Sequence, residues 1–197
     1  MKKLACLLLI LTIFASAMFF VVDVHASTPV GGFITSDTTW TRANSPYQFN
    51  GVVTVNNGVT LTIEPGVTVD FASWYLQVNG VLNARGTSDN KITLTSSTYS
   101  INQRIVFSSS STGWNEQTGT GSIIENANFD KVYLYISGSP KINKNYINTT
   151  YPLTVTDGSP MISNNIIYCI ESGVYVTGSF PTISGNLISV RVLIAES

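Results

Sequence analysis

Short runs of alternating apolar and polar residues recur along the chain after residue 26. In each run apolar side chains are separated by single polar or small ones, as a strand with one buried face requires. The clearest runs are Val53–Val55, Leu61–Ile63, Val67–Val69, Leu76–Val78, Ile92–Leu94 and Ile105–Phe107. No stretch beyond residue 26 combines helix-forming residues with helical spacing. The pattern predicts an all-β protein with almost no helix.

The second half of the sequence contains an internal repeat. Three copies start with Gly-Ser-Pro or Gly-Ser-Phe-Pro at Gly138, Gly158 and Gly178, and Phe180 lengthens the third copy by one residue. Equivalent positions carry the same residue types, namely isoleucine at Ile142, Ile162 and Ile183, asparagine at Asn145, Asn165 and Asn186, and isoleucine again at Ile147, Ile167 and Ile188. A fixed period of roughly 20 residues predicts a stack of similar structural units.

The period and the absence of a helix signal together predict a parallel β-helix, a solenoid of about 7–8 coils. Each coil would stack on the previous one at ~4.8 Å, and the stack would bury apolar columns that a single coil cannot. A leucine-rich repeat has a similar period but needs several leucines per repeat, and this chain has few. The asparagine column predicts a structural ladder, because stacked amides of Asn145, Asn165 and Asn186 can hydrogen-bond to one another at a bend.

Three sequence segments resemble a known family. They are Leu61-Thr-Ile-Glu-Pro-Gly-Val67, Gly80-Val-Leu-Asn-Ala-Arg-Gly86 and the later Pro-x-Ile-x-x-Asn-x-Ile repeat. Together they are similar to secreted bacterial and archaeal proteins with the pectin-lyase-like right-handed β-helix, among them the NosD-type β-helix domains. The resemblance covers most of residues 38–190 and implies a right-handed β-helix. It implies no single function, because this fold carries lyases, hydrolases, adhesins and surface-layer proteins.

The N-terminus has the layout of an export signal. Lys2 and Lys3 precede an apolar run from Leu4 to Val22, and Val24-His25-Ala26 offers a cleavage site before Ser27. We therefore expect a signal peptide over residues 1–26 and a β-helix domain over residues 27–197. The alternative is an uncleaved membrane anchor formed by residues 4–22. Either way, the body is expected outside the cytoplasm, in the periplasm, at the cell surface or in the extracellular medium.

Charge and residue counts exclude several classes of function. The net charge is −1 and no basic patch is present, so we expect no nucleic-acid partner. The single histidine, His25, lies in the expected signal, which excludes a Ser/His/Asp triad, a Cys/His dyad and a histidine-ligated metal in the body. No cofactor is expected. Cys169 is the one cysteine after the signal, which rules out an intramolecular disulfide there.

Three aromatic residues are candidates for ligand binding. Trp114 lies in the long non-repetitive stretch between Ser96 and Ser122, and binding residues often sit on such loops. If Leu134, Leu153 and Val174 point inward, Tyr135 and Tyr175 point outward, about 9–10 Å apart at strand spacing, and could stack on sugar rings. The alternative is packing alone: Trp114 folds back onto the coil, and the tyrosines cover a sheet face.

The arrangement of the carboxylates along the sequence distinguishes a binding module from an enzyme of this fold. A polysaccharide lyase or glycoside hydrolase of this fold needs clustered acids, with calcium in lyases, and the acids here are scattered. Asp130 and Glu125, with Asp157 one coil later, come nearest to a cluster. We therefore expect no catalytic and no metal residues, and a non-catalytic surface module that binds an extracellular polysaccharide or another surface protein. The alternative is a polysaccharide lyase or glycoside hydrolase.

The C-terminal residues also form an alternating pattern. Ile188, Val190, Val192 and Ile194 predict a strand of a last coil, with little sequence after it to cover the core. An uncovered coil exposes apolar side chains and unpaired backbone groups. We therefore expect either self-association through the C-terminal coil or a longer protein of which this chain is the start.

Overall fold

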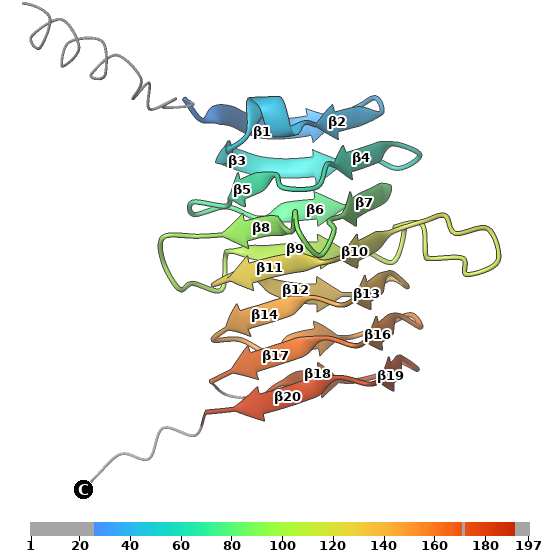
Figure 1. Cartoon of the computed structure of the whole chain (residues 1–197). Helices are drawn as coiled ribbons and strands as arrows, with labels where there is room; N and C mark the ends of the chain where they lie inside the picture. The colour runs from blue at the N-terminus through green and yellow to red at the C-terminus, as the bar shows by residue number, and fades with distance from the viewer. Residues whose placement is uncertain (1–25, 171, 192–197) are drawn as a thin grey trace, which may run out of the picture.

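A computed structural model describes residues 26–170 and 172–191, which form a parallel β-solenoid of about eight coils (Figure 1). This confirms the predicted all-β solenoid. The predicted signal and the alternative anchor fall outside the described residues, apart from Ala26. Within the described residues, no helix has the length and apolar character needed to cross a membrane.

Each coil contributes strands to three faces. The first face contains β6 (Leu76–Val78), β9 (Arg104–Phe107), β12 (Tyr133–Ile136), β15 (Leu153–Val155) and β18 (Val174–Val176). The second face contains β5 (Thr68–Asp70), β8 (Ile92–Thr95), β11 (Ala127–Asp130), β14 (Tyr146–Thr149), β17 (Ile166–Cys169) and β20 (Leu187–Val190). The third face contains β2 (Thr38–Trp40), β4 (Thr60–Ile63), β7 (Val81–Arg85), β10 (Ile123–Glu125), β13 (Lys141–Asn143), β16 (Met161–Ser163) and β19 (Thr182–Ser184).

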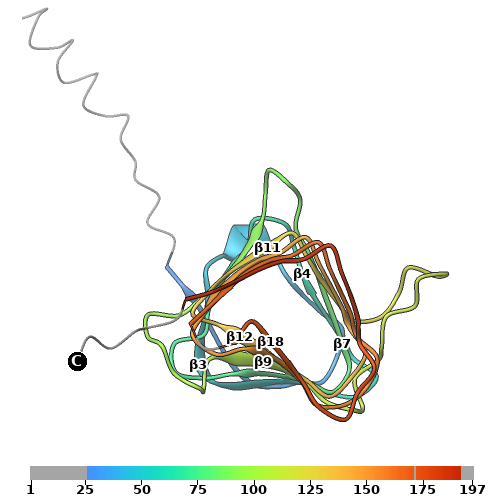
Figure 2. The ribbon, with the colours of Figure 1, turned by 90° about the horizontal axis from the view of Figure 1, so that it is seen from below.

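The first and second faces belong to one hydrogen-bonded sheet. They are joined by β3 (Tyr47–Val55), whose Tyr47 and Gln48 pair with β5 while Val53–Val55 pair with β6. β1 (Thr28–Ile34) pairs in parallel along β3, and a 3₁₀ turn, η2 (Arg42–Asn44), connects β2 to β3. The third face is a separate sheet of 7 strands. Seen along the axis, the strands wind around a single core (Figure 2).

The core consists of columns of inward side chains in register from coil to coil. Ile142, Ile162 and Ile183 pair across β13, β16 and β19, and Ile147, Ile167 and Ile188 pair across β14, β17 and β20, as the repeat predicts. On the first face the columns are Leu76, Ile105, Leu134 and Leu153, and Val78, Phe107, Ile136 and Val155, all of them fully buried. Strand alternation leaves the residues between these columns facing solvent.

The chain turns from the third face to the second at a single residue in the left-handed conformation. In four successive coils this residue is Asn126, Lys144, Asn164 or Gly185, with φ between 50° and 65°. Side chains other than glycine adopt this conformation at a cost, so surrounding contacts must hold it. The next residue supplies those contacts in the later coils, because it is one of the repeated asparagines.

Asn145, Asn165 and Asn186 follow this turn and bond to one another. The Asn165 amide nitrogen Nδ2 donates to Asn186 Oδ1 and to the Ile142 carbonyl, each at 2.9 Å. Its Oδ1 accepts from the backbone N–H of Asn145 at 2.9 Å and from Asn145 Nδ2 at 3.0 Å. Asn165 is almost fully buried, so these bonds satisfy polar groups that water cannot reach.

Two long connections interrupt the regular coils. One, residues 96–103, links β8 to β9 at the corner between the second and first faces, and we call it the corner loop. The other links β9 to β10 and includes an arm, residues 112–121, closed by an antiparallel bridge between Asn115 and Thr120. Figure 1 shows this arm projecting from the third-face side of the stack.

Candidate functional site

A groove lies on the first face, where outward side chains of three strands form two columns. Arg104 pairs with Tyr133, and Tyr75 precedes β6 in the same column. Beside it run Gln77, Val106 and Tyr135, which pair across β6, β9 and β12. Because consecutive strands stack at ~4.8 Å, the two columns place polar and aromatic groups on a flat, regular surface.

The corner loop forms one wall of the groove. Ile101 and Asn102 join the six outward side chains in lining a cavity of about 470 Å³. The Tyr133 hydroxyl donates to the Ile101 carbonyl at 2.9 Å, and Arg104 Nη1 donates to the same oxygen. Two side chains of the first-face strands therefore hydrogen-bond the corner loop to the rest of the groove.

Of the described side chains that line the groove, Arg104 alone carries a charge. Its guanidinium carbon lies 4.8 Å from the centre of the Tyr75 ring, a cation–π contact. Burial raises the pKa of Tyr133 above its usual range, against an opposing effect of Arg104. Tyr133 therefore stays protonated near neutral pH and acts as a hydrogen-bond donor. The site presents aromatic surface, one cation and neutral polar groups.

The structure places the predicted tyrosines on the same face. Tyr135 lines the groove, and Thr154 and then Tyr175 follow it in the same outward column on β15 and β18. Tyr175 is exposed but lies beyond the residues that line the cavity. The two predicted tyrosines thus form one line along the solenoid axis, with a threonine between them.

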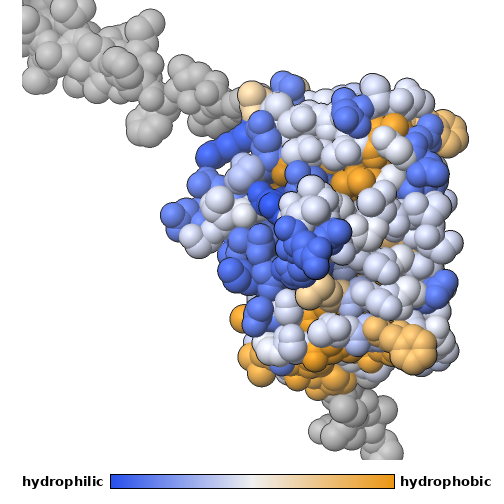
Figure 3. All heavy atoms as spheres, turned by 90° about the vertical axis from the view of Figure 1, so that its right-hand side faces the viewer, coloured by the Kyte–Doolittle hydropathy of each residue, from blue (hydrophilic) through white to orange (hydrophobic). Residues whose placement is uncertain are grey.

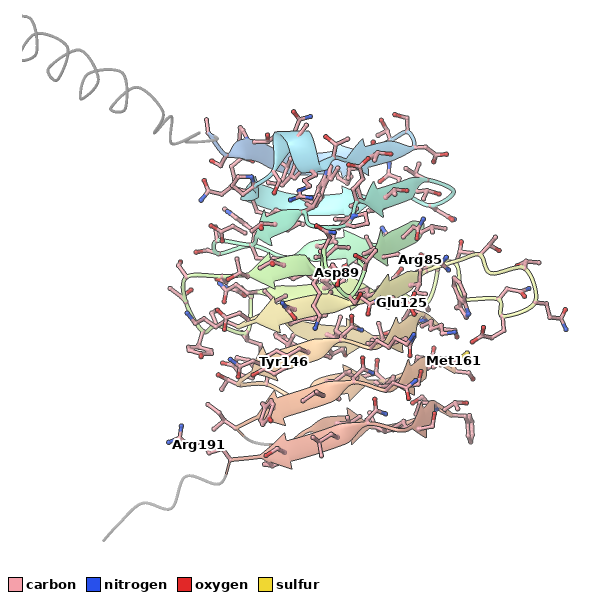
Figure 4. The ribbon with its side chains drawn as sticks, viewed as in Figure 1. Arg85, Asp89, Glu125, Tyr146, Met161 and Arg191 are labelled. Carbon is pink, nitrogen blue, oxygen red and sulfur yellow. The ribbon has the colours of Figure 1, made fainter. Side chains whose placement is uncertain are left out.

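Trp114 lies elsewhere, on the arm beside the third face. It lines a separate cavity of about 340 Å³ together with Asn83 and Arg85 of β7. Its ring centre is 4.8 Å from the Arg85 guanidinium and 5.3 Å from the Lys141 ammonium. Two cations therefore contact the ring. Figure 4 shows Arg85 at the base of the arm.

The arm is held to the coil next to Trp114. The backbone N–H of Trp114 donates to the Ser139 carbonyl at 2.8 Å, and Lys141 Nζ donates to Glu116 Oε1 at 2.5 Å. The Lys141 ammonium lowers the pKa of the Glu116 carboxyl. These contacts pack Trp114 against the coil.

The structure does not gather the acids singled out in the sequence into one site. The Glu125 carboxylate accepts from Asn143 at 2.5 Å, and Asp157 accepts from the backbone of Gly158 at 2.7 Å. The Asp130 carboxylate oxygen Oδ2 lies 4.0 Å from Lys131 Nζ, and its Oδ1 accepts a hydrogen bond from Asn148 Nδ2 at 3.4 Å. Across residues 26–170 and 172–191, no three acids, cysteines or histidines group as metal ligands would.

Sequence reasoning missed most of the groove. The alternating pattern alone does not distinguish Tyr75, Gln77, Arg104 and Tyr133 as ligand-binding residues. Their signal is nonetheless in the sequence, since each flanks an inward residue of a predicted strand by one position. What the sequence did not show is that the corner loop folds over these strands and makes a cavity of them.

Comparisons with known proteins support the β-helix fold. Residues 32–105 match the family model described as pectate-lyase like beta helix domain. The protein called "Protein bark beetle" from Drosophila melanogaster is 43% identical over 76 residues, which is 38% of this chain but 2% of that protein. The chain thus spans a very small share of that relative. No solved structure matches the chain.

The matched segment ends within the groove. It contains Tyr75, Gln77 and Arg104, whereas Tyr133 and Tyr135 lie beyond it. The groove is therefore built partly from the segment similar to the family and partly from later coils.

Proposed function

We propose that this chain, whose residues 32–105 match the pectate-lyase-like β-helix domain, is an exported, non-catalytic module that binds an extracellular polysaccharide along its first face. The observation that carries the proposal is the groove of about 470 Å³ lined by Tyr75, Tyr133, Tyr135 and Arg104.

The chemistry of the lining fits a sugar chain. Tyrosine rings offer apolar surface on which the C–H face of a sugar ring can pack, while their hydroxyls remain available to polar partners. Arg104, Gln77 and Asn102 add donors and acceptors for sugar hydroxyls. A few convergent polar groups on a largely apolar floor are typical of a ligand site.

The shape also favours a polymer over a compact ligand. The outward column of Tyr135, Thr154 and Tyr175 runs parallel to the solenoid axis, from the groove across two further strands. Tyr135 and Tyr175 are separated by about 9–10 Å at strand spacing. A glycan lying in the groove can therefore extend along this column and contact Tyr175.

Binding of glycans to purified residues 27–197 tests the proposal. A glycan array identifies binders, and calorimetry with the strongest binder gives its Kd. We expect Tyr135→Ala and Arg104→Ala each to weaken binding about tenfold, as the loss of a central contact in a binding site does. Phe180→Ala is the matched aromatic control, because Phe180 is 87% exposed and lies outside the groove.

Two results would count against this function. Absence of binding to any glycan, or equal Kd values for the wild type and Tyr135→Ala, would reject the groove as a carbohydrate site. Release of unsaturated uronate from an acidic polysaccharide in the presence of calcium would instead favour the lyase alternative. Loss of that release in Asp130→Ala or Asp157→Ala would assign it to those acids.

A further inference from the structure

A further cavity lies on the second face, across the corner loop from the groove. We call it the second cavity, after the face on which it lies. It has a volume of about 380 Å³ and is lined by Tyr99, Tyr146, Tyr168, Asn148 and Arg191, among others. The Tyr146 and Tyr168 rings lie 5.6 Å apart at an angle of 48°. Figure 4 shows Tyr146 on β14 and Arg191 after β20 in the left-hand half of the stack.

Both cavities are bordered by the same loop and the same corner. Tyr99 lines the second cavity, and Ile101, two residues later, lines the groove. The Lys131 ammonium lies 5.2 Å from the centre of the Tyr99 ring, and Tyr133, two residues after Lys131, belongs to the groove. The corner loop is thus a ridge with a tyrosine-lined cavity on each side.

The second cavity repeats the chemistry of the groove. Tyrosine rings form its apolar surface, Asn148 and Ser189 add neutral hydrogen-bonding groups, and Arg191 adds a cation. Among the described residues that line it, none carries a negative charge. Tyr146 and Tyr168 are each 39% exposed, so both rings are accessible although they contact each other.

We infer that the second cavity is a further contact site for the same polysaccharide, reached by a chain that crosses the corner loop. This inference rests on the proposed function, because the groove is the site that the rest of the chain would occupy. A short glycan fills the groove alone. A longer one extends along the column toward Tyr175 at one end, and at its other end passes the ridge formed by Tyr99 and Ile101 and packs on Tyr146 and Tyr168.

Dependence on glycan length tests the inference. The probes are cello-, xylo-, chito- and galacturono-oligosaccharides, each from the disaccharide to the octasaccharide, titrated into residues 27–197. For a series that binds, we expect Tyr168→Ala to weaken the octasaccharide about tenfold and to leave the shortest binding member unchanged. Tyr135→Ala is expected to weaken both.

Ile166→Ala is the matched control for Tyr168→Ala. Ile166 lies on the same strand, is 40% exposed, and does not line the second cavity. We expect it to leave the octasaccharide Kd unchanged. Urea midpoints of both variants, equal to that of the wild type, would show that the changed binding does not come from unfolding.

The outcomes separate the two proposals. If short glycans bind and depend on Tyr135 while Tyr168→Ala leaves the octasaccharide Kd unchanged, the inference is wrong and the proposed function stands. An equal loss in Ile166→Ala would also reject it, because the contact would then be the general apolar surface of this face. If neither these series nor any glycan of the array binds, the proposed function itself fails.

Discussion

Asn165 links three coils through its side-chain amide. It bonds to Asn145 above it, to Asn186 below it and to the Ile142 carbonyl, and it is nearly fully buried. An apolar replacement of similar size would leave these partners without bonds in a place that water does not reach. Leaving a buried polar group unsatisfied costs more than a hydrogen bond contributes on balance.

We therefore expect Asn165→Leu to lower the free energy of unfolding by roughly 1–3 kcal/mol. The measurement is the urea midpoint of residues 27–197. Thr154→Val is a suitable control, because Thr154 lies on an outward column and, within the described residues, its hydroxyl bonds only to the nearby Pro152 carbonyl. A midpoint of Asn165→Leu equal to that of the wild type would show that the ladder contributes nothing to stability.

Glycines in the segment from Gly80 to Gly86 have a packing reason. A Cβ at Gly80 would lie 2.2 Å from the Val59 carbonyl oxygen, and one at Gly86 would lie 2.3 Å from that of Asn126. Neighbouring coils approach these positions through their backbones, which cannot move aside as a flexible side chain can. Close contact between coils thus explains the glycines at both ends of this segment.

At the scale of elements, strands and corners differ in how far the sequence predicts them. The predicted runs coincide with β4, β5, β6, β8 and β9 to within one residue, and the repeat sets the register of β13, β16 and β19. Alternation and period suffice because every coil buries the same columns. The corner loop has neither, so its path over Arg104 and Tyr133 could not be predicted.

The same distinction applies to the candidate site. Outward placement of Tyr135 and Tyr175 follows from the inward neighbours Leu134 and Val174. The cavity around Tyr135 depends on Ile101 and Asn102, which come from a different, non-repetitive element. The separation of Trp114 from the tyrosines has a similar cause, because the arm leaves the coil on the third face rather than the first.

The tie between the corner loop and the groove gives a prediction for this element. Tyr133→Phe removes the hydroxyl that donates to the Ile101 carbonyl at 2.9 Å and keeps the ring. A neutral hydrogen bond contributes about 1 kcal/mol, so we expect amides of residues 96–103 to exchange with solvent roughly fivefold faster. Hydrogen exchange read by mass spectrometry measures this.

The arm provides the internal reference for that experiment. Its amides, in residues 112–121, depend on Asn115, Thr120 and Ser139 rather than on Tyr133, and their exchange is expected to stay unchanged. Faster exchange in both segments would mean that Tyr133→Phe loosens the whole fold. Unchanged exchange in the corner loop would mean that its other contacts, among them those of Arg104 with Ile101 and of Gln103 with Ala72, hold it without the Tyr133 hydroxyl.

At the scale of the whole molecule, the core columns are less buried in the last described coil than in the middle of the stack. Ile147 and Ile167 are at most 1% exposed, whereas Ile188, next in the same column, is 42% exposed. Val176, Ile183 and Val190 of the last described coil are exposed as well. Figure 3 shows apolar residues gathered toward this end of the stack.

Backbone and charge at this end also favour association. β18, β19 and β20 are edge strands of their sheets, with one side free of a strand partner in the described chain. Proteins often protect such edges with charged side chains, and residues 172–191 contain a single one, Arg191. An apolar face bordered by unpaired backbone and carrying little charge favours pairing with another copy of the same face.

We therefore propose that residues 27–197 self-associate through the last coil, and predict oligomers at tens of micromolar in light scattering. Val190→Lys should shift them to monomers, because a buried ammonium in the contact would lose its hydration. Thr62→Lys, which adds the same charge to the outward surface of β4, should leave the mass unchanged. A wild-type monomer at that concentration, with the same mass in Val190→Lys, would refute association. The exposed ends of the isoleucine columns would then tolerate water without a partner.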